Sequence, residues 1–156
     1  MALALTMLKS EVASWPGISV RLHQFVAQEF RYRQAEVGHI HLWGDADIPF
    51  TRAVRDLLLE EHLAMRHRWI PDSGWVTFHV GNQTDAEHAI WLMRLSYLRY
   101  ALKADPDPVG LLEREAKRLR LAPRLVSLLA AFMPGSAGGS EGKGAEKVPS
   151  AFVRAR

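Results

Sequence analysis

The chain has 156 residues, of which 48% are hydrophobic and 24% charged, and its net charge is +3; these values are typical of one soluble globular domain. It contains no cysteine, which excludes disulfides, thiolate metal sites and cysteine nucleophiles and fits a cytoplasmic location. No segment approaches the roughly 20 apolar residues of a membrane helix, and the mildly apolar N-terminus lacks a basic leader, so we expect neither membrane contact nor a signal peptide.

The first third of the chain predicts a helix followed by three strands. A loose apolar stripe of helical spacing ends before the helix breaker Trp15-Pro16-Gly17; it consists of Leu3, Leu5, Leu8 and Val12. Residues 18–25 alternate between apolar and polar side chains, as a half-buried strand does. EFRYR and EVGHIHLW predict two more strands with a tight turn near Gln34-Ala35, which places Phe30 opposite His39.

The next stretch predicts a helix and a hairpin. Pro49 and Thr51 begin a helix that runs to about Glu61. MRHRWI and WVTFHV are expected to be strands that flank the four-residue loop PDSG, whose proline, aspartate and glycine suit a turn. This hairpin places Ile70 opposite Trp75.

The C-terminal part predicts three helices and a tail. Thr84-Asp85-Ala86-Glu87 has the spacing of a capping box and begins a helix that runs to about Lys103. That helix is apolar on two faces and must be covered on both, by the sheet and by helices near 108–121 and 123–133. We therefore expect one α+β domain over residues 1–133, with a mostly antiparallel sheet of about five strands covered by helices. Residues 134–156 are rich in Gly, Ser and charge and predict a disordered tail.

Four segments together resemble the luciferase-domain proteins of bacteria and fungi. These segments are WPGI, EVGHIHLWGDADIPF, IPDSGWVTFHV and AIWLMRLSYLRY, in this order. The resemblance covers residues 10–103, leaves 104–133 as a helical extension, and implies a fold but no reaction. A flavin-dependent luciferase uses a TIM barrel of typically about 250 residues, and this chain is too short for one. It also lacks a Walker phosphate loop and a dinucleotide fingerprint.

The resemblance also bears on individual positions. Relatives carry the GHxH element and a His-His pair before PDSGW; here the first of that pair is His67, and Arg68 stands in place of the second. An arginine cannot ligate a metal, although it can hold a carboxylate or phosphate. A weaker likeness, at the level of fold, links residues 51–61, 65–80 and Ser96-Tyr97 to MmcQ/YjbR-like domains, and it implies no function.

Three histidines are the candidate metal ligands. His39 and His41 are two apart on a predicted strand and so share a face. The predicted hairpin places His67 opposite Phe78, which would bring all three histidines to the helix-covered side of the sheet. With Asp45 or Asp47 nearby, they can hold zinc, or iron through two histidines and one carboxylate. The alternative is that they are histidines at the edge of the core, hydrogen-bonded to the backbone or to each other, since HExxH and paired CxxC motifs are absent.

Carboxylates and tryptophans supply further candidates. Asp45 and Asp47 can do general acid–base work if burial raises one pKa, although Gly-Asp-Ala-Asp is also typical of a turn. Trp43 and Trp75 are candidates for stacking on a ligand, whereas Trp69 is expected in the core by the register of the hairpin. No cofactor and no reaction can be assigned from these residues.

The positive charge is concentrated in the C-terminal third. Residues 94–124 carry 8 basic and 4 acidic side chains, whereas residues 1–93 carry 8 and 11. Four cations of the helix near 108–121 can contact the phosphates of a nucleic acid or an acidic protein; they are Arg114, Lys117, Arg118 and Arg120. The alternative is a solvated helix face with local ion pairs to Glu113 and Glu115.

Overall fold

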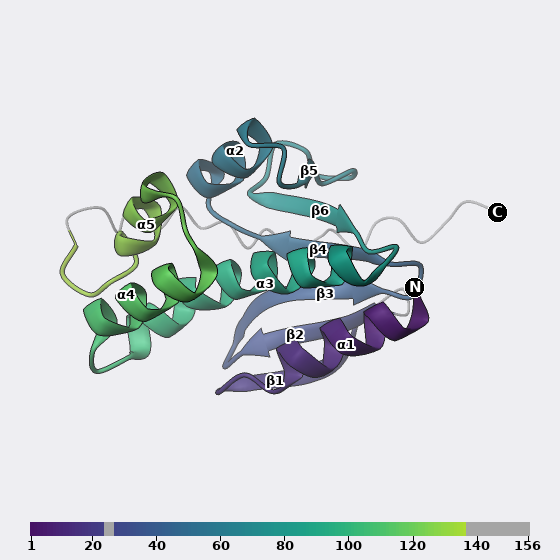
Figure 1. Cartoon of the computed structure of the whole chain (residues 1–156), viewed down its shortest axis with the longest axis horizontal. Helices are drawn as coiled ribbons and strands as arrows, with labels where there is room; N and C mark the ends of the chain where they lie inside the picture. Colours follow the sequence, from purple (N-terminus) through teal and green to yellow (C-terminus); the bar gives the residue numbers. More distant parts are fainter. Residues whose placement is uncertain (24–26, 137–156) are drawn as a thin grey trace.

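A six-stranded antiparallel sheet, with its strands in the order β1-β2-β3-β4-β6-β5, forms the centre of the protein (Figure 1). The computed structural model describes residues 1–23 and 27–136. The α+β class is confirmed, with one strand more than expected. In chain order the elements are α1 (Ala2–Ala13), β1 (Ile18–His23), β2 (Ala27–Tyr32), β3 (Ala35–His41), β4 (Asp45–Pro49), α2 (Arg52–Glu60), β5 (Met65–Arg66), β6 (Trp75–His79), α3 (Gln83–Ala104), α4 (Pro108–Leu119) and α5 (Pro123–Ala130).

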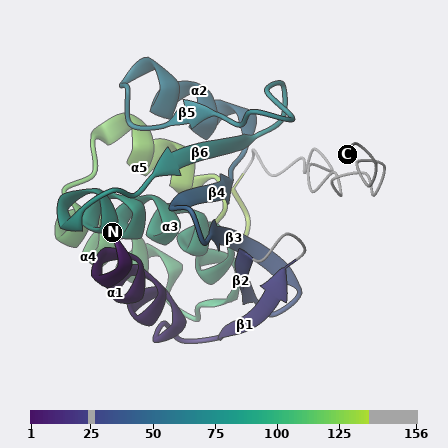
Figure 2. The ribbon, with the colours of Figure 1, turned by 90° about the vertical axis from the view of Figure 1, so that its right-hand side faces the viewer.

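The hydrophobic core lies between the sheet and α3. α1 and α4 pack beside α3 on the same side of the sheet (Figure 2). Alternate residues of the central strands point toward α3 and are fully buried, among them Phe30, Ile40, Ile48 and Val76. α3 is capped by Asn82 through a capping box with Asp85, so the predicted cap at Thr84 is wrong by two residues. Asn82 accepts the Asp85 N–H, and the Asp85 carboxylate accepts the Asn82 N–H.

The register of β2 and β3 differs from the prediction by one residue. The chain reverses at Arg33 and Gln34, where Arg33 adopts a left-handed φ of 55°. A β-bulge between Phe30 and Arg31 then shifts the register, so that Glu29 lies opposite His39, and the expected partner of His39, Phe30, lies opposite Gly38. A shift of one residue moves side chains to the other face of a sheet, and this one turns His39 and His41 away from α3.

Within the segment Gly-Asp-Ala-Asp, only the glycine lies in a turn; Asp45, Ala46 and Asp47 belong to a strand, so their prediction as a turn is wrong. The turn is confined to residues 42–44, and Asp45–Pro49 form β4, inserted between β3 and β6. Ala46 and Ile48 are fully buried on the α3 side, whereas Asp45 and Asp47 alternate with them on the other face. The two aspartates alternate with Ala46 and Ile48, so that the strand presents polar side chains to one face of the sheet and apolar side chains to α3.

The predicted strand 65–70 is much shorter in the structure. Only Met65 and Arg66 pair with β6, opposite Thr77 and Val76; the predicted pairs of Ile70 with Trp75 and of His67 with Phe78 are therefore wrong. His67 Nδ1 accepts the backbone N–H groups of Trp69 and Ile70, which turns the chain away from the sheet.

Two tryptophans exchange their expected environments because of this turn. Trp69, expected in the core, is 71% exposed, and Trp75, a candidate for stacking on a ligand, is only 7% exposed. The return to β6 passes close to Phe50, whose N–H donates to the Gly74 carbonyl at 3.0 Å.

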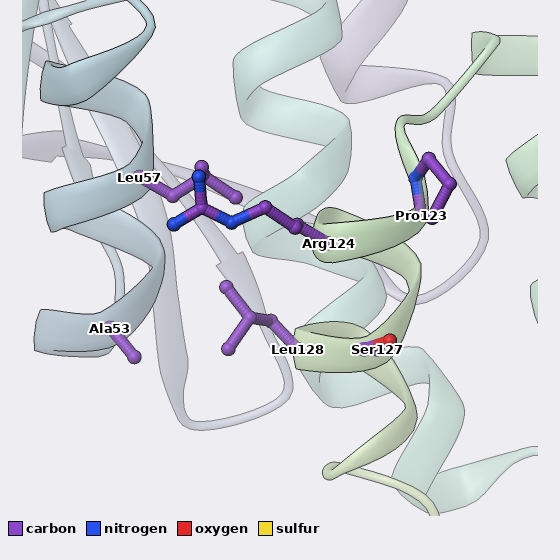
Figure 3. A pocket seen from close by; sticks show the side chains of 6 residues that line it. All are labelled: Ala53, Leu57, Pro123, Arg124, Ser127 and Leu128. Carbon is purple, nitrogen blue, oxygen red and sulfur yellow. The ribbon is translucent and has the colours of Figure 1, made fainter.

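The C-terminal helices α4 and α5 pack against α3 and against each other, and α2 lies beside α5. A groove between α2 and α5 is lined mostly by small and apolar side chains, with Arg124 extending across it toward α2 (Figure 3). Arg124 forms an exposed ion pair with Glu60 of α2, at 3.1 Å. Of the predicted tail 134–156, residues 137–156 lie outside the described residues. Among the residues that are described, no helix is long and apolar enough to cross a membrane.

Candidate metal centre

A cluster of polar side chains lies on the face of the sheet opposite α3, centred on Asp47 of β4. We call it the Asp47 cluster; its members are Asp47, His39, His41, His67, Thr77 and Glu36. The three histidines do converge, but the prediction that they do so on the helix-covered side is wrong. The corrected register of β2 and β3 is the reason. Asp47 and all three histidines are at least 91% buried.

One oxygen atom of Asp47 lies at the centre of the cluster. Asp47 Oδ2 is 3.0 Å from His41 Nε2 and 3.4 Å from the Nε2 atoms of His39 and of His67. The other oxygen, Oδ1, accepts a hydrogen bond from the Thr77 hydroxyl. Burial favours the neutral acid and opposes the lowering of the Asp47 pKa, but the hydrogen bonds from His39, His41, His67 and Thr77 outweigh it and hold that pKa far below its usual range. Asp47 is therefore a carboxylate at any physiological pH.

His39 lies between two carboxylates. Its Nδ1 is 2.6 Å from Glu36 Oε1, and its Nε2 faces Asp47. Burial opposes protonation of the ring, but the hydrogen bonds to Asp47 and Glu36 prevail and raise the pKa of His39 to about 9. Glu36 reaches His39 because β3 has an irregularity between the two residues, where the register with β2 shifts between Phe30 and Arg31. This irregularity brings Glu36 to the same face of the sheet as His39.

His41 presents Nε2 to Asp47 and stacks on Trp43. The ring centroids of His41 and Trp43 are 4.2 Å apart, and the two planes are only 19° from parallel. His41 Nδ1 is buried without a hydrogen-bond partner. Trp43 is fixed in this position because its Nε1–H donates to Asp45 Oδ2 at 2.8 Å.

His67 contributes to the cluster in a different way. Its Nδ1 accepts two backbone N–H groups, at 3.2 Å and 3.4 Å. A neutral imidazole has one lone pair and one N–H, so the Nε2 of His67 carries the proton and faces Asp47 as a donor. This arrangement orients Asp47 and leaves His67 without a free lone pair for a metal.

Three members of the Asp47 cluster have the geometry of a metal site: His39, His41 and Asp47. One potential ligand atom from each lies within 4.8 Å of the other two. Two ligand atoms about 2.1 Å from one ion are about 3.0 Å apart at a right angle and about 3.4 Å apart at the tetrahedral angle. The distances from Asp47 Oδ2 to His41 and His39 are 3.0 and 3.4 Å.

Several other candidates do not join the cluster. Asp45 lies on the same face as Asp47 but binds Trp43 and the half-exposed His79, at 2.8 Å each. Of the predicted stacking residues, Trp75 is buried against His39 and His67, with ring centroids 5.5 and 6.1 Å away. Arg68 lies over the exposed ring of Trp69, 5.0 Å from its centroid.

The sequence prediction missed Glu36 and Thr77. A Glu three residues before a histidine on a strand has no diagnostic spacing, because an unbroken strand would place the two on opposite faces. Thr77 could have been found once β4 was recognised, since it lies directly opposite Asp47 on β6.

The basic residues near the C-terminus lie apart from this site. Arg114, Lys117, Arg118 and Arg120 are all exposed on α4 or at its end. Arg118 contacts Glu115 at 2.8 Å, and Glu115 also binds Arg94 of α3 through two hydrogen bonds. The local ion pair expected for Glu115 is therefore present, and the role of these cations in binding a partner stays a prediction.

Comparisons with known proteins bear on the family alone. Residues 34–96 match the family model described as Luciferase domain, and this segment contains every member of the Asp47 cluster. Searches of curated proteins and of solved structures found no match, so the likeness to MmcQ/YjbR-like domains is not confirmed. The resemblance inferred from the motifs is confirmed over its central part by this match to residues 34–96.

Proposed function

We propose that this domain binds one divalent transition-metal ion through His39 Nε2, His41 Nε2 and Asp47 Oδ2, and that the open coordination positions receive a small molecule. The observation that carries the proposal is the convergence of two imidazole nitrogens on one carboxylate oxygen, at 3.0 and 3.4 Å. Two histidines and one carboxylate that leave positions open are typical of catalytic zinc and of non-haem iron(II).

The partners of the three ligands support a metal site. In metal sites, a ligating histidine usually donates its other N–H to a carboxylate, and a ligating carboxylate is itself hydrogen-bonded. Glu36 serves His39 in this way, while Thr77 and His67 serve Asp47. Of the three ligands, only His41 is held by a stacked ring, that of Trp43.

The energetic cost of burying the Asp47 carboxylate also supports a metal site. A buried carboxylate surrounded by imidazoles contributes little to stability compared with apolar packing of the same volume. The core of this protein lies on the other face of the sheet, so the fold does not need a polar cluster here. A metal ion would replace the Nε2 protons of His39 and His41 while keeping Asp47 charged.

Metal titration of the whole chain, purified without a histidine tag and stripped with a chelator, tests the proposal. Cobalt(II) is a suitable probe because its visible absorption reports coordination number and nitrogen ligation. We expect one equivalent to bind, and His41→Ala to abolish stoichiometric binding. His79→Ala is the matched control, because His79 is also on this face but pairs with Asp45. Stoichiometric binding that survives His41→Ala and Asp47→Asn, or no binding of cobalt(II), zinc(II) or iron(II) by the folded wild type, would contradict the proposal.

The alternative function is a nonenzymatic one, in which α4 binds a nucleic acid or an acidic protein. The exposure of Arg114, Lys117, Arg118 and Arg120 on one helix and its C-terminal end supports it. A gel shift with a nucleic acid should then weaken as salt rises, and weaken further in the double variant Lys117→Ala, Arg118→Ala. Binding that is indifferent to salt argues against it.

A further inference from the structure

Unpartnered polar atoms gather around the Asp47 cluster. Among residues 1–23 and 27–136, three buried side-chain nitrogens have no hydrogen-bond partner: Trp75 Nε1, His41 Nδ1 and Arg31 Nε. All three belong to residues in or beside the cluster. Trp75 contacts His39 and His67, and Arg31 binds Glu29, the strand partner of His39.

Two of these nitrogens are donors by chemistry. The indole Nε1–H of Trp75 and the Nε–H of Arg31 cannot accept a hydrogen bond. Leaving a buried donor unpaired is costly, so a ligand that brings an acceptor oxygen to such a donor gains a hydrogen bond. Such a ligand presents an acceptor oxygen on the side of the cluster where Trp75 packs.

Exposed apolar side chains surround the same cluster. Trp43 is 52% exposed while its ring is fixed over His41. Met65, directly opposite Thr77 in the sheet, is 57% exposed, and Trp69 is 71% exposed beside His67. Fixed and half-exposed indoles are suited to hold the apolar or aromatic part of a small molecule. Arg68, whose guanidinium lies over Trp69, adds positive charge at this edge.

We infer that the site takes a small carboxylic acid with an apolar body, of the aromatic acid class. One carboxylate oxygen occupies an open position of the metal, the carboxylate accepts the Trp75 Nε1–H, and the apolar body packs against Trp43. This inference rests on the proposed metal site and names the class of molecule that the site receives.

Titration of the cobalt(II)-loaded protein with acetate and with benzoate, followed by visible absorption, tests the inference. Benzoate should bind more tightly than acetate, and benzyl alcohol, which lacks the carboxylate, should leave the spectrum unchanged. Trp75→Phe keeps an aromatic ring but removes the N–H, and it should weaken both acids by about 2- to 12-fold, the value of one hydrogen bond. Trp43→Ala should weaken benzoate binding more than acetate binding. Trp91→Phe is the control: it also removes an indole N–H, but one that donates to the Leu119 carbonyl instead of facing the Asp47 cluster. It should leave the affinity for both acids unchanged.

A second measurement uses the wild type and so does not depend on the folding of a variant. In protein labelled with ¹⁵N-tryptophan, the Trp75 indole N–H resonance should move downfield when benzoate is added to the metal-loaded form. Equal affinities of wild type and folded Trp75→Phe for both acids, or an unmoved Trp75 resonance at saturating benzoate, overturns the inference. Failure to bind cobalt(II) at all counts instead against the metal site, so the two failures are distinguishable.

Discussion

Asp47 of β4 lies directly across from His39 of β3, and Asp47 Oδ2 is 3.4 Å from His39 Nε2. Residues directly opposite each other in an antiparallel pair have their Cβ atoms about 5 Å apart on the same face. The contact is therefore fixed by the register of two central strands. Any change that alters this register, or either side chain, acts on the candidate metal centre directly.

Replacing Asp47 should disrupt both stability and metal binding. Asp47→Asn leaves the amide group facing donors that the carboxylate accepted from His39, His41, His67 and Thr77. We expect the free energy of unfolding, measured in urea, to fall by about 2–4 kcal/mol. Asp45→Asn is the matched control on the same strand and face, and it should cost less than about 1 kcal/mol because its contact with His79 is partly exposed. Equal losses in the two variants would show that the Asp47 cluster has no special energetic role.

His67 should behave as a partner of Asp47 rather than as a metal ligand. Its Nδ1 lone pair is already used by the backbone of Trp69 and Ile70. His67→Ala should therefore weaken cobalt(II) binding by about 10- to 100-fold, the usual effect of losing an orienting partner, while the stoichiometry stays at one. His41→Ala should eliminate the stoichiometric step. If both variants lose it, His67 is itself a ligand and the assignment of its proton to Nε2 is wrong.

The helices and the class of fold followed from the sequence, whereas the face on which the site lies did not. Capping residues located the start of α3 to within two residues, and Thr51 is the N-cap of α2, whereas Pro49, expected at the beginning of that helix, ends β4. The side of the sheet reached by His39 depended on the β2–β3 register, and the β-bulge between Phe30 and Arg31 inverted the predicted side. Local patterns do not encode register strongly when both faces of a strand are buried, and His39, Ile40 and His41 are all buried.

The convergence of the histidines was predicted for a reason that was partly wrong. His67 was expected on a strand, paired with Phe78, but it reaches Asp47 from an irregular segment. The fold of that segment depends on long-range contacts, such as the hydrogen bond between Phe50 and Gly74. A single sequence does not reveal such contacts.

Glu115 should make stability depend on acid pH. Burial opposes ionisation, but Arg94 and Arg118 hold the pKa of Glu115 below its usual value of 4.5. A carboxyl whose pKa is lower in the folded than in the unfolded state stabilises the protein above the unfolded pKa, and this contribution is lost as the pH falls toward the folded pKa. Glu115→Gln should therefore be less stable than wild type at pH 7, and the difference should shrink as the pH falls below the usual value of 4.5. Urea unfolding at several pH values measures it, and a difference that does not change with pH would contradict the assignment.

Gly38 of the GHxH element should be required because its neighbours leave no room for a side chain. A Cβ at this position would lie 2.6 Å from Met93 Sδ of α3 and 2.9 Å from the Asp47 carbonyl oxygen. Gly38→Ala should cost at least about 2 kcal/mol of unfolding free energy and should also weaken cobalt(II) binding, because the backbone of Asp47 must move. Gly81→Ala is the control, since its Cβ would meet only the tip of Asp85 at 3.3 Å.

The double variant Gly38→Ala, Met93→Ala separates the two contacts of Gly38. Truncating Met93 makes room on the α3 side, but it leaves the backbone of Asp47 in place. We expect the double variant to bind cobalt(II) more weakly than Met93→Ala alone. The reason is that the Asp47 carbonyl cannot rotate away from the new Cβ without breaking the β3–β4 pairing of His39 with Asp47. Full recovery would show that the glycine serves only the packing of α3. Failure to recover would tie the glycine of this motif to the position of the metal-binding carboxylate.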